Sequence, residues 1–132
     1  MSIRCLTSLR LIGDDFDLSS LLIDIGLKPD CIWKKGDSLI LGKKSVIYSD
    51  SGISFDIKLQ PCLDLSEQIS LLLDRLKPYA GRFIEAANKH HLQTSLSCVV
   101  YSEDNIFPSV FIKKELLKDI LRFNADIDID IY

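Results

Sequence analysis

The sequence predicts a single α+β domain over residues 1–132, in which helices pack on one face of an antiparallel or mixed sheet. Three observations lead to this prediction. Segments of alternating apolar and polar residues occur at both ends of the chain, helical segments with regularly spaced leucines lie between them, and the length suits one domain. The order of these segments favours a ferredoxin-like arrangement with an extra C-terminal α-β unit.

In the first part of the chain, the residue pattern predicts a strand over residues 3–12, followed by a short helix. Apolar residues recur at the spacing of one helical face, at Leu18, Leu21, Leu22 and Ile25. Asp15 or Asp17 is placed to cap the start of this helix, and Gly26 to end it.

The stretch over residues 28–44 is irregular and locally basic, and predicts a long loop with one short strand around 38–41. Strands are expected at 45–48 and 53–59. The intervening Asp50-Ser51-Gly52 has the composition of a hairpin turn, so these two strands are expected to pair.

The second half predicts two consecutive helices, a strand, a helix and a final strand. Asp64 caps the first helix, and Pro78 introduces a bend before the second. A strand is expected over residues 92–101 and a last helix over 113–123. Four apolar residues of that helix are expected to point inward, namely Leu116, Leu117, Ile120 and Leu121.

The final strand, at 125–132, has the most regular pattern in the chain. Three isoleucines, Ile127, Ile129 and Ile131, alternate with three aspartates, Asp126, Asp128 and Asp130. Successive strand residues point to opposite faces, so the isoleucines are expected on the core face and the carboxylates on the other, about 7 Å apart. The aspartates either form a solvated face neutralised by Arg4 and Arg10 on a neighbouring strand, or dock a basic protein.

The charge balance narrows the class of partner. The chain has 16 Lys and Arg against 19 Asp and Glu, a net charge of −3, which gives no affinity for a phosphate backbone. Nucleic acid is therefore not expected as a partner. No apolar run is long enough to cross a bilayer, so no membrane contact is expected.

The four cysteines, Cys5, Cys31, Cys62 and Cys98, contain no CxxC pair, which disfavours a zinc or redox motif. Two disulfides in a secreted protein would be consistent with the even count. The N-terminus has no signal-peptide pattern, however, which favours reduced thiols and a cytoplasmic location.

Catalytic and metal-binding patterns are not found. His90 and His91 close a predicted helix, where a positive charge suits the helix dipole. No GxSxG, HExxH, P-loop or GxGxxG pattern occurs, and the aspartate strand lacks the Gly and distal Glu of a calcium loop. We expect no catalytic residue, no metal and no cofactor; a hydrolase that uses His90 or His91 is the least favoured hypothesis.

Acidic residues and one aromatic residue are the candidates for contact with a partner. Trp33 either plugs the edge of the core or forms an interface hot spot. The expected partner-binding residues are Asp14, Asp15, Trp33, Glu103, Asp104, Asp126, Asp128 and Asp130.

Several segments together resemble a known family. The opening strand runs into Gly13-Asp14-Asp15-Phe16-Asp17, a helix ends at Ile25-Gly26-Leu27-Lys28-Pro29, and Trp33-Lys34-Lys35-Gly36-Asp37 follows. With Leu96-Ser97-Cys98-Val99-Val100-Tyr101 and the ending at 125–132, these segments resemble the bacterial domain of unknown function 4279 over nearly the whole chain. One departure is at residues 107–114, where Ile112-Lys113-Lys114 stands in place of a Ser-Pro helix cap.

This resemblance implies no known enzymatic activity. It implies instead a suspected immunity protein that neutralises a bacterial toxin of a contact-dependent or polymorphic system. The leading hypothesis is therefore a non-enzymatic domain that binds a basic cognate toxin, such as a nuclease. The alternative is a small-molecule-sensing or regulatory domain of ferredoxin-like type. The oligomeric state is left open.

Overall fold

The computed structural model describes residues 3–41, 43–103 and 105–132. A five-stranded sheet forms its centre, in the order β2-β5-β1-β6-β7, and a separate hairpin contains β3 and β4. The strands are β1 Ile3–Gly13, β2 Cys31–Trp33, β3 Ser38–Leu41, β4 Lys44–Ile47, β5 Ser51–Pro61, β6 Gln93–Ser102 and β7 Asp126–Ile131. The helices are α1 Leu18–Ile25, α2 Leu65–Leu76, the 3-10 turn η1 Lys77–Tyr79, α3 Ala80–His90 and α4 Lys114–Arg122.

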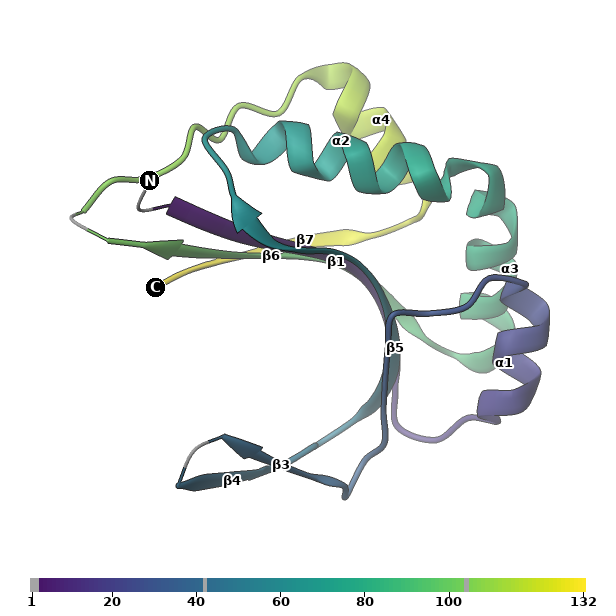
Figure 1. The fold of residues 1–132 in the computed structure, drawn as a ribbon. Coiled ribbons are helices and arrows are strands. Elements are labelled where there is room, and N and C mark those ends of the chain that lie inside the picture. Colours follow the sequence, from purple (N-terminus) through teal and green to yellow (C-terminus); the bar gives the residue numbers. More distant parts are fainter. Residues whose placement is uncertain (1–2, 42, 104) are drawn as a thin grey trace.

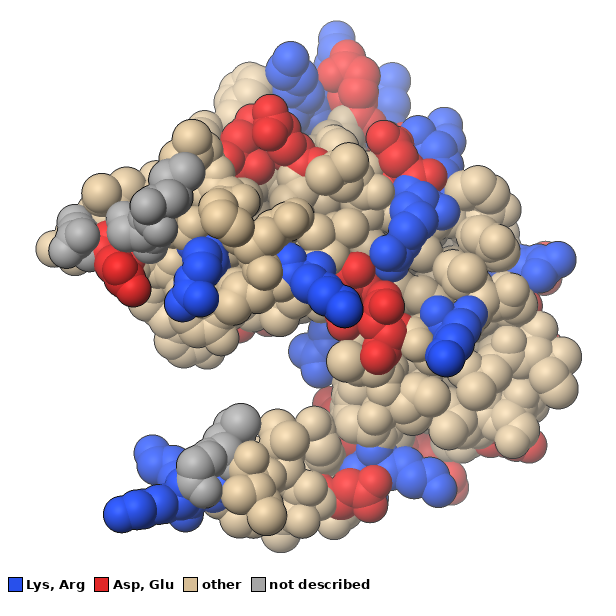
Figure 2. All heavy atoms as spheres, viewed as in Figure 1, with Lys and Arg blue, Asp and Glu red and all other residues tan. Residues whose placement is uncertain are grey.

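The topology confirms the predicted α+β class. Each strand in the series β2, β5, β1 and β6 is antiparallel to the next one. This strand order is that of a ferredoxin-like sheet. The α4–β7 unit then adds a fifth strand parallel to β6. The helices lie along the outer side of the curved sheet, and its inner side faces the β3–β4 hairpin across a hollow (Figures 1 and 2).

Strand β1 lies at the centre of the sheet and pairs along its length with both β5 and β6. Its residues alternate, so Ile3, Cys5, Leu9 and Leu11 are fully buried beneath the helices. Large aromatic side chains complete the core from other elements. Phe83 on α3 packs edge-to-face against Phe55 at 5.1 Å and against Phe123 at 5.6 Å between ring centroids.

The helix boundaries follow the predicted capping residues. The Asp17 carboxylate accepts a hydrogen bond from the Ser20 N–H at 3.2 Å, and Gly26 ends α1 in the left-handed conformation at φ 72°. Asp64 caps α2, and Pro78 lies in the 3-10 turn that separates α2 from α3. The predicted bend in this helix pair is confirmed.

A buried polar contact joins α2 to β1 where the strand pairing is irregular. The register between β1 and β5 shifts between Cys5 and Thr7, which marks a bulge. Gln68 on α2 donates its side-chain N–H to the Cys5 carbonyl at 3.0 Å and accepts the Thr7 hydroxyl. This side chain thus supplies hydrogen bonds that a buried bulge needs.

The structure corrects the predicted pairing after residue 28. Strand β4 pairs with β3 rather than with β5, so Asp50-Ser51-Gly52 joins a hairpin to the sheet and is not a hairpin turn. The prediction also missed β2, a three-residue strand that pairs with β5. Two turns compete for β4, and the one between the paired residues Leu41 and Lys44 forms the hairpin. β5 pairs instead with β1, which is distant in the chain.

The structure also corrects part of the predicted core. Leu116 and Ile120 of α4 are buried as expected, but Leu117 and Leu121 are exposed, with Leu121 70% accessible. The isoleucines of β7 lie on the expected face, yet only Ile129 packs against the core cluster. Ile127 and Ile131 are exposed because β7 is an edge strand and α4 does not cover it fully.

Replacing Gly52 with alanine is expected to destabilise the fold. Gly52 lies between Ile12 and Trp33 on neighbouring strands. A Cβ there would overlap the Trp33 ring and approach the Leu11 carbonyl oxygen to 2.8 Å. We expect G52A to lower the free energy of unfolding by about 1–3 kcal/mol in urea denaturation.

The matched control is Gly81→Ala on α3, where an added Cβ has no neighbour within 4 Å. Helix propensity predicts that this change raises stability by up to about 1 kcal/mol. Equal stabilities for G52A and the unaltered protein would contradict close packing of Trp33 on Gly52.

Candidate protein-binding surfaces

The aspartates of β7 form a row along one edge of the sheet. β7 runs parallel to β6 in a register that places Asp126 beside Ser95, Asp128 beside Ser97 and Asp130 beside Val99. This face of the sheet is the inner one that no helix covers. The three carboxylates, which we call the aspartate ladder, are exposed.

Arg4 and Arg10 do not neutralise the aspartate ladder. Both belong to β1, and β6 lies between β1 and β7, so two strand spacings of about 4.8 Å each separate the rows. The Arg10 guanidinium instead lies over the Trp33 ring, 4.7 Å from its centroid. The ion pairs among the described residues include none from the ladder. The Gln93 side chain donates to Asp126 at 2.9 Å, which leaves Asp128 and Asp130 the more available carboxylates.

The remaining predicted residues fall into two further positions. Glu103 follows β6, where the Ser102 N–H donates to the Tyr132 carbonyl at 3.0 Å, so it lies near the end of the ladder. Asp104 lies outside the described residues. Asp14 and Asp15 line a hollow of about 470 Å³ together with Trp33 and Lys35, near the opposite edge of the sheet. The predicted residues therefore do not form one site.

Trp33 is an internal anchor rather than an exposed aromatic residue. Its side chain is only 9% accessible. The indole N–H donates to Asp50 at 2.9 Å, and the ring stacks on Tyr48 with centroids 6.2 Å apart. Because Tyr48 and Asp50 follow β4, these contacts hold the base of the β3–β4 hairpin to the sheet.

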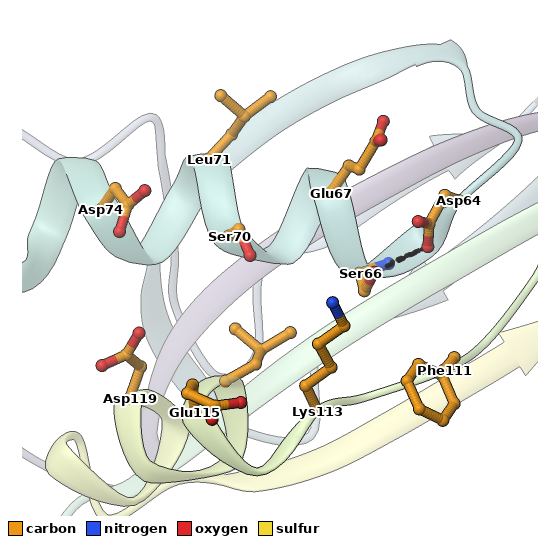
Figure 3. Close-up of a pocket in the computed structure, with 11 residues that line it drawn as sticks. Asp64, Ser66, Glu67, Ser70, Leu71, Asp74, Phe111, Lys113, Glu115 and Asp119 are labelled. Atoms are coloured by element: carbon orange, nitrogen blue, oxygen red, sulfur yellow. Dashed lines mark hydrogen bonds between the residues drawn. The ribbon is translucent and has the colours of Figure 1, made fainter.

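A second acidic surface was missed by the sequence prediction. A groove of about 680 Å³ lies between α2 and the segment that leads into α4 (Figure 3). Its lining includes one lysine, Lys113, and five acidic residues, Asp64, Glu67, Asp74, Glu115 and Asp119. Phe111, 66% accessible, lies at the rim. These residues are far apart in the chain, and each looks like an ordinary solvent-facing position by itself.

The comparison with known families supports the resemblance noted in the sequence. The chain matches the family described as "Domain of unknown function (DUF4279)" over residues 3–132. This chain belongs to that family. Comparison with curated proteins and with solved structures gives no significant match.

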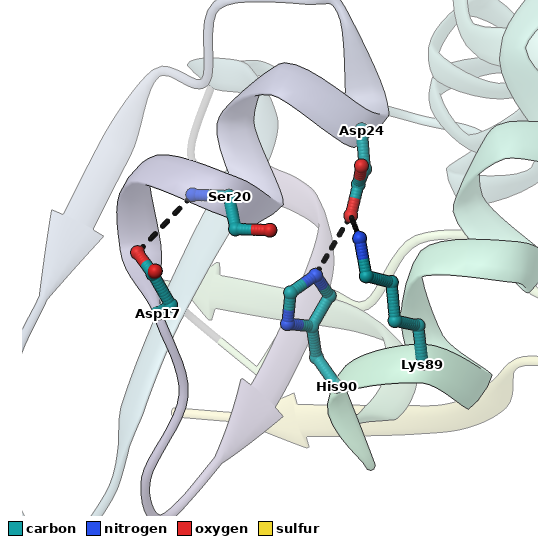
Figure 4. A network of polar contacts seen from close by, with 5 residues as sticks. All are labelled: Asp17, Ser20, Asp24, Lys89 and His90. Carbon is teal, nitrogen blue, oxygen red and sulfur yellow. Dashed lines mark hydrogen bonds and ion pairs between the residues drawn. The ribbon is translucent and has the colours of Figure 1, made fainter.

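His90 of this DUF4279 domain joins α3 to α1 (Figure 4). His90 Nε2 lies 2.8 Å from an Asp24 carboxylate oxygen, and Lys89 Nζ lies 3.0 Å from the same oxygen. Among the described hydrogen bonds, none joins His90 to a serine or cysteine. His91 is exposed and ends α3 in the left-handed conformation at φ 56°.

The cysteines of the DUF4279 domain are free thiols, and three of them are buried. Burial raises the pKa of Cys5 to about 12, to which the neighbouring Cys62 thiol contributes. Burial raises the pKa of Cys98 to about 11. Cys31 is exposed at the sheet edge, with its sulfur 3.5 Å from an Asp56 carboxylate oxygen.

No group of three or more His, Cys, Asp and Glu side chains is arranged to hold a metal ion within the described ranges. Of the helices described, none combines the length and apolar composition needed to cross a bilayer.

Asp24→Asn is expected to lower the melting temperature near neutral pH. Hydrogen bonds from His90 and then Lys89 hold the pKa of Asp24 below its ordinary value of 3.8. A carboxyl group with a lowered folded-state pKa stabilises the protein above that ordinary value, and the stabilisation is lost as pH falls through the folded-state pKa. The difference between D24N and the unaltered protein should therefore shrink in acid, as followed by thermal melts across pH.

Glu85→Gln removes one carboxylate from the exposed face of α3 and serves as the control. A D24N effect that is independent of pH would contradict stabilisation by the charged Asp24 carboxylate.

Only one of the four thiols is expected to react in the native protein. A thiolate is the reactive species, so burial and a raised pKa protect Cys5 and Cys98. At about pH 8, a maleimide should label one thiol per chain, slowly, because partial desolvation of the Cys31 sulfur and the Asp56 charge raise the pKa of this exposed thiol. Mass spectrometry should find four labels in denaturant and none in native C31S. A second native label would contradict the buried positions of the other three.

Proposed function

We propose that this DUF4279 domain is a non-enzymatic immunity protein that binds and neutralises a basic bacterial toxin. The observation that carries the proposal is the aspartate ladder, whose carboxylates lie on an uncovered face away from Arg4 and Arg10. None of the ion pairs described for residues 3–41, 43–103 and 105–132 balances this row of like charges, which favours a partner that brings the opposite charge.

Electrostatic attraction suits the task of an inhibitor. Complementary charge accelerates association and selects among partners, so a toxin would be captured quickly. An inhibitor that blocks the active site of a toxin needs only to cover that site and does not need catalytic residues of its own. The exposed Ile127 and Ile131 lie on the opposite face of the same edge strand, so a partner that covers the edge of β7 would also gain apolar contact area.

The acidic groove between α2 and α4 is a second surface that a basic partner could contact. Part of its charge is already balanced, since Lys77 Nζ lies 3.2 Å from Asp119 and 3.9 Å from Asp74. Asp64 is used as the cap of α2. The aspartate ladder is therefore the stronger candidate.

The proposal is tested by co-purification with the product of the adjacent gene, and by protection of cells that express that product. The variant Asp126→Asn, Asp128→Asn, Asp130→Asn should raise the Kd at least about tenfold at low salt, with a smaller effect at high salt. Isothermal titration calorimetry at two salt concentrations measures both effects.

The matched control is Glu67→Gln, Asp74→Asn, Glu115→Gln, which removes the same formal charge from the α2–α4 groove. We expect it to bind with nearly unchanged affinity. Binding that is lost in the control and kept in the ladder variant would move the interface to the groove. A neighbouring product that neither binds nor harms cells would overturn the immunity role.

A further inference from the structure

The outer edge of β7 presents backbone groups that pair with no described strand. β7 ends the strand order, and its pairing is with β6 alone. The Tyr132 N–H donates a hydrogen bond to the Val100 carbonyl at 2.8 Å, and the Tyr132 carbonyl accepts one from the Ser102 N–H at 3.0 Å. In a parallel sheet, the N–H and carbonyl groups of one residue point to the strand on one side, and those of the next residue point to the other side. The aspartates lie an even number of residues from Tyr132, so their N–H and carbonyl groups also point to β6. The N–H and carbonyl groups of the isoleucines therefore point away from the sheet.

The two faces of this edge differ in chemistry. Ile127 and Ile131 are 38% and 53% accessible on the core side, beside Ile129, which packs against the core cluster. The aspartate ladder occupies the inner face. A strand added to this edge would therefore meet apolar side chains on one face and carboxylates on the other.

We propose that β7 binds an extended segment of the partner by strand addition, and that this segment alternates basic and apolar residues. The inference rests on the proposed function and specifies how the partner is held. Backbone hydrogen bonds would form to the isoleucine residues, basic side chains would lie beside Asp126, Asp128 and Asp130, and apolar side chains would cover Ile127 and Ile131.

The charge pattern selects this occupant over a second copy of the chain. Two β7 strands paired antiparallel about a twofold axis would place their aspartates on the same face, where facing carboxylates repel. The opposite edge of the sheet offers fewer backbone groups for strand addition, since β2 has only three residues, Cys31–Trp33.

The test uses the full chain and a capped peptide of about eight residues that alternates lysine and valine. Amide hydrogen exchange, followed by NMR, reports on single residues. The peptide should slow exchange at Ile127, Ile129 and Ile131, whose N–H groups point outward. It should change exchange much less at Asp128 and Asp130, whose N–H groups already face β6. Exchange that is unchanged along β7 would overturn strand addition.

Two control peptides separate strand addition from charge attraction. One has the same composition with all lysines first, and the other is N-methylated at the residues that would donate to β7. Both should bind at least about tenfold more weakly, as should the alternating peptide with the triple aspartate-to-asparagine variant. Equal binding of all three peptides would overturn the proposal.

The outcomes distinguish this inference from the proposed function. A toxin that binds while the isoleucine amides of β7 stay unprotected would preserve the immunity role and overturn strand addition. A peptide that protects those amides, with no toxin encoded by the adjacent gene, would support the edge site and overturn the immunity role.

Discussion

The structure depends on the one-sided burial of its central strand. β1 is hydrogen-bonded along both edges, so its alternating side chains define one apolar face and one polar face for the whole sheet. The described helices lie on one side of the sheet (Figure 1), and the buried side chains of β1 face them. The other face carries polar and charged residues such as Arg4, Ser97 and Asp128, of which Arg4 and Asp128 are exposed to water. The surface available to a partner follows from how the core is buried.

The position of the Arg10 side chain affects both the base of the β3–β4 hairpin and the charge of the aspartate ladder. Its guanidinium stacks on Trp33, whose ring also packs on Gly52 and contacts the base of the β3–β4 hairpin. Because Arg10 is placed there, it is not available to balance the aspartates two strands away. An interaction that fixes one end of the sheet therefore leaves the charge of the other edge uncompensated, which is the basis of the proposed function.

The polar contacts inside this DUF4279 domain are structural, and several surface charges are also used in ion pairs, such as Lys77 with Asp119. Gln68 donates a hydrogen bond to the Cys5 carbonyl where the pairing of β1 with β5 shifts register, and Asp24 joins α1 to His90 on α3. Cys5 and Cys98 are buried thiols whose raised pKa values keep them protonated. Asp128 and Asp130, by contrast, have no ion pair among the described contacts. Recognition of a partner is therefore expected at the edge of the sheet rather than in its interior.

Local sequence signals predicted the helices and most of the strands, whereas contacts between distant residues set how these elements pair and pack. Periodicity and caps such as Asp17, Asp64 and Gly26 predicted the helices, because these signals are local in the chain. The alternation in β7 likewise predicted which face each side chain takes. Whether Arg10 lies beside Asp128, whether β5 pairs with β1, and whether Glu67 meets Glu115 across a groove depend on strand order and helix packing. Those long-range contacts join residues far apart in the chain, and no local pattern encodes them.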